Sequence, residues 1–119
     1  MKYKLLEILK SPNDKLICVD LDGTLCIGEA WTNEQCLTTT PKQDIIDKVN
    51  KMYTSGGHII IYTARPETFR PETEYWLNKF GVRYHALVMA TRKMPADLYI
   101  DDKCLNVEDL IINKQNNEN

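Results

Sequence analysis

Asp20-Leu21-Asp22-Gly23-Thr24 follows directly on the apolar run Leu16-Ile17-Cys18-Val19. Such a run predicts a buried strand, and the Asp-Gly pair predicts a turn at its carboxyl end, which is the edge where open α/β sheets bind ligands. Side chains two residues apart on an extended chain share one face, so both carboxylates can address one centre. Like charges this close need a cation or a proton between them. The stretch therefore predicts a metal-dependent site.

Four short apolar runs have the composition of parallel strands that are covered on both faces. They are residues Lys15–Val19, His58–Tyr62, Ala86–Met89 and Leu98–Ile100. Periodicity predicts helices in the intervals, over residues 1–10, 41–53, 71–80 and 107–112. Thr40-Pro41-Lys42-Gln43 is typical of a capping box with proline at the first helical position.

Strands that alternate with helices predict an α/β fold with right-handed crossovers. We expect a three-layer, Rossmann-like architecture, in which a central, mainly parallel sheet carries helices on both faces. One domain is expected over residues 1–112, and the polar tail 113–119 is expected to be disordered. If the first strand is central, the strand ends at Asp20, Thr63, Ala90 and Asp101 converge on one edge of the sheet.

Composition and charge exclude several classes of function. The formal net charge is −2 and the basic residues are scattered, which argues against a nucleic-acid partner. No stretch has the length and apolarity of a membrane span, and the first ten residues do not resemble a signal peptide. The four cysteines lack metal-binding spacing, so free thiols in a reducing cytoplasm are expected.

Each predicted strand ends in a distinctive polar group. Carboxylates follow the first and last strands, as Asp20, Asp22 and the pair Asp101-Asp102. Three or four carboxylate oxygens with waters suit Mg²⁺. A hydroxyl at Thr63 and a positive charge at Arg92 or Lys93 suit the oxygens of a phosphoryl group.

In this order the motifs resemble those of the haloacid dehalogenase (HAD) superfamily of phosphatases. The first motif, DxDGT, is met by Asp20 to Thr24, and the second by Thr63. The third, a basic residue, fits Lys93 better than Arg92, because Lys93-Met94-Pro95-Ala96-Asp97 resembles the usual lead-in to the last strand. The fourth, acidic motif is Asp101-Asp102.

The resemblance implies a role for each of these residues. Asp20 would be the nucleophile that forms an aspartyl-phosphate, and Asp22 the general acid and then the general base. Thr63, Ala64, Arg65 and Lys93 would bind the phosphoryl group or the substrate. Asp20, the backbone carbonyl of Asp22, and Asp102 or Asp101 would hold Mg²⁺, with Asp102 favoured as the direct ligand.

The intervals between the motifs are too short for a separate cap domain. Only residues 25–39 remain for a flap, so the chain resembles the capless class, and a second subunit or the substrate itself would supply a lid. Trp31 is the flap residue expected to cover the leaving group. Other short motifs resemble small phosphatases of capsule or surface polysaccharide biosynthesis, which implies a sugar- or polyol-phosphate substrate.

Two other functions remain open at this point. The same motifs occur in nucleotide and polynucleotide 3′-phosphatases, and a chain that kept the site without turnover would be a phosphate-binding or interaction module. For single residues, structural interpretations compete with functional ones: Arg65 is as well placed for a surface ion pair with Glu67 or Glu72, and Trp31 for anchoring its loop.

Overall fold

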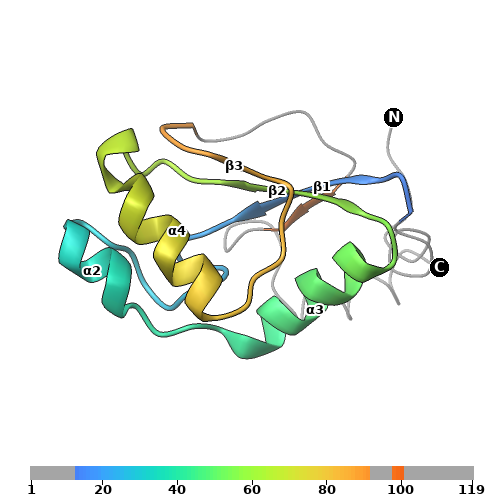
Figure 1. Cartoon of the computed structure of the whole chain (residues 1–119), viewed down its shortest axis with the longest axis horizontal. Coiled ribbons are helices and arrows are strands. Elements are labelled where there is room, and N and C mark those ends of the chain that lie inside the picture. Colours follow the sequence, from blue (N-terminus) through green and yellow to red (C-terminus); the bar gives the residue numbers. More distant parts are fainter. Residues whose placement is uncertain (1–12, 92–97, 101–119) are drawn as a thin grey trace, which may run out of the picture.

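Four parallel strands form the sheet of the computed structural model, which describes residues 13–91 and 98–100. Their order across the sheet is β3-β2-β1-β4, so that β1 lies between β2 and β4 (Figure 1). The strands span β1 (Leu16–Asp20), β2 (His58–Tyr62), β3 (Ala86–Val88) and β4 (Leu98–Ile100). The predicted runs are therefore confirmed to within one residue at each end, as is the central place of the first strand.

Three helices and one short 3-10 turn connect the first three strands. They are α2 (Asn33–Thr38), α3 (Gln43–Thr54), η1 (Glu67–Phe69) and α4 (Arg70–Lys79). Because β1, β2 and β3 succeed one another in the same direction, right-handed crossovers place α3 and α4 on the same face of the sheet. Figure 1 shows this face covered, with α2 beside α4.

The helices predicted over residues 1–10 and 107–112 lie outside the described residues, as does the tail 113–119. A helical layer on the second face of the sheet therefore stays a prediction. Within residues 13–91, the intervals between strands hold only the elements named above, and no separate cap domain is present there. No helix in the described part of the chain is long and apolar enough to cross a membrane.

The predicted start of α3 is wrong. The helix begins at Gln43, its N-cap is Lys42 without a side-chain hydrogen bond, and Thr40 does not cap it. The backbone before the helix pairs instead with the loop after β1: Ile27 N donates to Thr40 O at 2.8 Å, and Lys42 N donates to Leu25 O at 2.8 Å. These bonds hold the chain extended up to Lys42 and delay the first helical turn.

The core lies between the sheet and the helices that cover it. Ile17, Val19, Ile59 and Ile61 face it from the inner strands with no exposed surface. The apolar side of α3 supplies Ile45, Ile46, Val49 and Met52, as its periodicity predicts. On α4, Thr73, Trp76 and Leu77 are buried as predicted, whereas Phe80 is only partly covered.

Residues 25–39 form a flap that is fixed to the body of the fold. It contains α2, a six-residue helix that the sequence patterns do not predict. Trp76 Nε1 on α4 donates to Thr39 O at 2.8 Å, and Asn33 Nδ2 donates to Thr68 O at 3.1 Å. The flap is thus tied to α4 and η1, which lie between β2 and β3.

Candidate active site

The turn that follows β1 is tightly folded around Gly23. The backbone at Gly23 has a positive φ of 81°, a conformation that glycine adopts without steric cost. Gly23 N donates to Gly28 O at 2.9 Å, and Lys42 Nζ donates to Gly23 O at 2.9 Å. At the end of the strand, Leu21 N donates to Asp20 Oδ1 at 2.8 Å. These contacts fix the backbone that carries the two carboxylates.

The loop after β2 is held against the end of β3. Thr63 N donates to Val88 O at 3.0 Å, and Thr91 N donates to Thr63 O at 3.0 Å. The Thr63 hydroxyl accepts a hydrogen bond from Arg65 N at 3.1 Å, which closes a turn typical of Ser and Thr. Thr63 is almost completely buried, and Asp20 lies beside Tyr62 in the β1–β2 register. Asp20 and Thr63 therefore occupy the same edge of the sheet.

Arg65 and Asp22 form the dominant interaction of the site. Arg65 Nη2 lies 2.6 Å from Asp22 Oδ1, and Arg65 Nε lies 3.1 Å from Asp22 Oδ2. The arrangement is bidentate, which is the strong form of a guanidinium–carboxylate contact. The Arg65 side chain is 3% exposed and that of Asp22 is 18% exposed, so solvent screens this pair only weakly.

The environment of Arg65 maintains its positive charge. Burial alone would lower the pKa of the guanidinium, but the hydrogen bonds and negative charge of Asp22 outweigh that effect and raise it. Arg65 Nη1 also donates to Thr73 Oγ1 on α4 at 3.0 Å. The alternative of a surface pair between Arg65 and Glu67 or Glu72 is wrong, since Glu67 pairs with Arg70 at 2.7 Å.

Two buried cysteines lie close to this ion pair. Cys26 Sγ is 3.7 Å from Asp22 Oδ1, and Arg65 Nη2 is 4.0 Å from Cys26 Sγ. Burial raises the pKa of Cys26 and of Cys36, so both stay neutral thiols at physiological pH. Among the described cysteines, Cys18, Cys26 and Cys36 are free, as expected; Cys104 lies outside the described residues.

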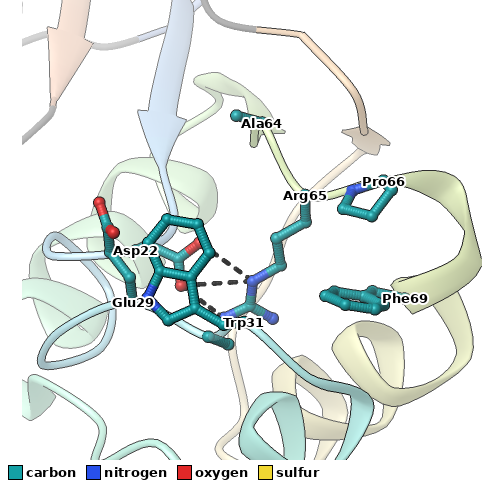
Figure 2. Close-up of a pocket in the computed structure, with 8 residues that line it drawn as sticks. Asp22, Glu29, Trp31, Ala64, Arg65, Pro66 and Phe69 are labelled. Carbon is teal, nitrogen blue, oxygen red and sulfur yellow. Dashed lines mark hydrogen bonds and ion pairs between the residues drawn. The ribbon is translucent and has the colours of Figure 1, made fainter.

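A pocket of about 460 Å³ opens beside the ion pair (Figure 2). Its lining combines residues of the DxDGT turn, the flap, the loop after β2 and η1: Asp22, Glu29, Ala30, Trp31, Ala64, Arg65, Pro66 and Phe69. The structure thus brings together four predicted site residues, Asp22, Trp31, Ala64 and Arg65. Glu29 and Phe69 were not predicted, because neither belongs to a motif and only the folded chain brings them to this site.

The remaining predicted site residues lie outside the described part of the chain. These are Lys93, Arg92 as the alternative basic residue of the third motif, and the pair Asp101-Asp102. The residues that the structure describes contain no group of three side chains that could hold a metal ion. Two of the predicted donors lie among the described residues, the Asp20 carboxylate and the Asp22 carbonyl, and both are oxygens of the kind that Mg²⁺ prefers. Ile100, the last residue of β4, pairs with Val19, directly before Asp20.

Comparison with known proteins identifies the family to which this chain belongs. The model of the family "polynucleotide kinase PNKP phosphatase domain", of the HAD type, matches residues 14–107, which is most of the chain. Comparison with curated proteins gives no match.

Several solved structures have a similar fold. A target protein from Vibrio cholerae is 25% identical with a TM-score of 0.57, over 87% of this chain and 98% of that one. A conserved protein from Bacteroides thetaiotaomicron is 20% identical with a TM-score of 0.64, over 89% and 91%. A chain of the Pnkp1/Rnl/Hen1 complex is 22% identical with a TM-score of 0.58, over 71% of this chain but only 31% of that one. Together with the family match, the shared fold and the DxDGT turn show that the chain is a phosphatase of the HAD superfamily, in the family of the PNKP phosphatase domain.

Proposed function

We propose that the chain hydrolyses the phosphomonoester of a small sugar- or polyol-phosphate, with Mg²⁺, through an aspartyl-phosphate on Asp20. One observation carries the proposal: the carboxylate of Asp22 lines a pocket and is held there by two nitrogens of a buried arginine. A side chain that exchanges a proton with the substrate must be placed within hydrogen-bond reach of it. The Asp22–Arg65 pair supplies that placement.

In the first half of the proposed reaction, an Asp20 carboxylate oxygen attacks phosphorus and the bond from phosphorus to the leaving oxygen breaks. A proton on the Asp22 carboxyl passes to that oxygen, which leaves as an alcohol. In the second half, Asp22 accepts a proton from a water that attacks the aspartyl-phosphate. Inorganic phosphate is released, Asp20 is regenerated, and Asp22 again carries the proton.

Arg65 fixes the direction in which the Asp22 side chain points. Both Asp22 oxygens accept hydrogen bonds from the guanidinium, and this bidentate contact holds the carboxyl group in one orientation. Arg65 is therefore proposed to position Asp22 and not to contact the phosphate itself.

The other predicted residues complete the proposal. Thr63 would donate its hydroxyl proton to a phosphoryl oxygen while its oxygen accepts from Arg65 N, and Lys93 would offset the negative charge of the phosphoryl group. Asp20, the Asp22 carbonyl and Asp101 or Asp102 would hold Mg²⁺, which supplies positive charge next to the transferring group. The pairing of Ile100 with Val19 supports this assignment, because the acidic pair directly follows β4 in sequence.

A second candidate is the 3′-phosphate of a polynucleotide. The name of the matching family favours it. The scattered basic residues and the net charge of −2 favour the small substrate, because polynucleotide binding draws mainly on clustered positive charge.

The decisive experiment measures phosphate release from an aryl phosphate and from a panel of sugar, polyol and nucleotide monophosphates, with Mg²⁺ and with EDTA. We expect activity that requires Mg²⁺ and is abolished by Asp20→Asn. Asp22→Asn should reduce kcat/KM for alkyl phosphates far more than kcat/KM for the aryl ester, because kcat/KM reports the steps up to departure of the leaving group and the aryl group needs no proton.

Asp47→Asn, an exposed carboxylate on α3, is the matched control and should leave activity unchanged. Activity that survives Asp20→Asn would contradict the covalent mechanism. Absence of phosphate release from every ester would contradict the proposed reaction, and release only from 3′-phosphorylated oligonucleotides would favour the second candidate.

A further inference from the structure

The aromatic wall of the pocket is held out toward solvent. Trp31 is 75% exposed, although its indole offers a large apolar face. Its backbone N donates to Gln35 Oε1 at 2.7 Å, and the Thr32 hydroxyl caps α2 by accepting from Gln35 N at 3.1 Å. Trp31 is therefore fixed at the start of α2 without being covered by the chain. A ligand that covers the indole removes apolar surface from water, which favours binding.

The described residues that line the pocket carry more negative than positive charge. Among the described lining residues, Arg65 is the one cation, and its charge is matched by Asp22. Glu29 adds an exposed carboxylate without a cationic partner in the lining. Figure 2 shows Asp22 and Glu29 on the Trp31 side of the pocket and Phe69 on the other side of Arg65. A ligand in this pocket meets one apolar face and one carboxylate that accepts hydrogen bonds.

We propose that this pocket binds the leaving group of the substrate and selects an uncharged, polyhydroxylated one, with its C–H face on Trp31 and its hydroxyls donating to Glu29. This inference rests on the proposed function, because the group that receives a proton from Asp22 must lie against Asp22. It goes further by excluding a second anionic group, such as a carboxylate or a phosphodiester, from the leaving group.

Size and electrostatics both support this selection. A volume of about 460 Å³ lies in the lower part of the range for small-molecule sites. A ligand carboxylate about 6 Å from Glu29 in a solvent-exposed pocket would be repelled enough to weaken binding about three- to ten-fold. The same repulsion acts on the phosphodiester next to a 3′-terminal phosphate, which makes a polynucleotide end a poor occupant.

The test compares two ligands that differ at one end. Glucitol 6-phosphate carries a hydroxymethyl group where gluconate 6-phosphate carries a carboxylate, and they are otherwise alike. Dissociation constants are measured with the Asp20→Asn variant and Mg²⁺, so that no turnover occurs. Trp31 fluorescence reports binding, because Trp76, the second of the two tryptophans, is 1% exposed. We expect glucitol 6-phosphate to bind about three- to ten-fold more tightly.

Two charge reversals identify the residue responsible. Glu29→Lys should reverse the preference, so that gluconate 6-phosphate binds more tightly. Glu34→Lys makes the same change of net charge at an exposed position of the flap that does not line the pocket, and it should leave the ratio nearly unchanged. At about 1 M salt, where the Debye length is roughly 3 Å, the ratio measured with Glu29 unchanged should approach one.

Several results would overturn the inference. These are equal affinities for the two ligands, equal effects of Glu29→Lys and Glu34→Lys, no binding of either ligand, or tighter binding of a dinucleotide 3′-phosphate than of glucitol 6-phosphate. These measurements do not depend on turnover. Failure of the proposed reaction would instead appear as absent phosphate release, so the two failures are distinguishable.

Discussion

Replacing Arg65 by methionine should separate the placement of Asp22 from the rest of catalysis. Methionine keeps much of the apolar stem but removes three hydrogen bonds to Asp22, at 2.6, 3.1 and 3.3 Å, and one to Thr73 at 3.0 Å. The loss leaves a carboxylate that is 18% exposed without its counter-ion. Because water still reaches Asp22, we expect the free energy of unfolding to fall by about 2 kcal/mol, which is less than for the loss of a fully buried pair.

The effect on turnover should depend on the leaving group. A positioned proton donor contributes roughly 10²- to 10⁴-fold to reactions that need it. With Arg65→Met, we expect kcat/KM for an alkyl phosphate to fall about 100-fold and that for an aryl phosphate to fall less than about ten-fold. The assay is phosphate release from both esters under identical conditions, with folding checked by urea denaturation.

A matched control is available in the same region. Arg70 also forms hydrogen bonds to a carboxylate, Glu67, but it lies outside the pocket lining. Arg70→Met should therefore leave the ratio of alkyl to aryl turnover unchanged. If Arg65→Met fails to fold, Arg65→Lys keeps the charge with a single donor group and should show a smaller change of the same ratio. An equal fall for both esters with either Arg65 variant would refute the placement of Asp22 by this arginine.

Three further predictions concern stability, and each is measured by urea denaturation. Gly56→Ala should lower the free energy of unfolding by about 2 kcal/mol, because φ is +97° and the new Cβ would clash with the Asn13 side chain and lie 3.3 Å from Asn13 Cα. Gly81→Ala, at φ +69° with open space around it, should lower it by about 1 kcal/mol, and equal losses would contradict the close approach at Gly56. Trp76→Phe should cost about 1–3 kcal/mol through the lost hydrogen bond to the flap and a small cavity, and an unchanged midpoint would show that this tie is dispensable. Burial raises the pKa of Cys18 in the folded chain above its ordinary value of 9.0, so its contribution to stability is complete below pH 9.0 and is lost as pH rises from there through the raised folded pKa. Cys18→Ala should therefore lose less stability than the wild type as pH rises above 9.0, and parallel losses would contradict this.

The strands and the two main helices were predictable because their patterns are local. Each strand is a continuous apolar run, and α3 shows four buried residues at helical spacing. The start of α3 was not predictable from Thr40-Pro41-Lys42-Gln43, because backbone bonds from Leu25 and Ile27, more than ten residues away, set it. The six residues of α2 are too few to show a period, although Thr32 and Gln35 carry a capping signal.

The positions of the candidate site residues were predictable only where a sequence motif marks them. Asp20, Asp22 and Thr63 stand at strand ends, and strand ends can be read from the sequence. The partner of Arg65 could not be predicted from the sequence, because Asp22 lies 43 residues away and other carboxylates are nearer along the chain. Glu29 and Phe69 lack any signal, since the geometry of the flap and of η1 brings them together.

The closed base of the flap has a consequence for how this fold acquires new specificities. Ile27 N and Thr40 O are joined by a 2.8 Å hydrogen bond, so the chain leaves and rejoins the body of the fold at nearly one point. Between these two residues the segment is anchored through Gly28 O, Asn33 and Thr39 O, whereas the side chains of Glu29 and Trp31 are exposed. These two positions are therefore open to substitution without loss of the anchoring bonds, and Asp20, Asp22 and Arg65 lie outside the segment. Substitutions at Glu29 and Trp31 are expected to change the specificity while the residues proposed to carry the reaction keep their places.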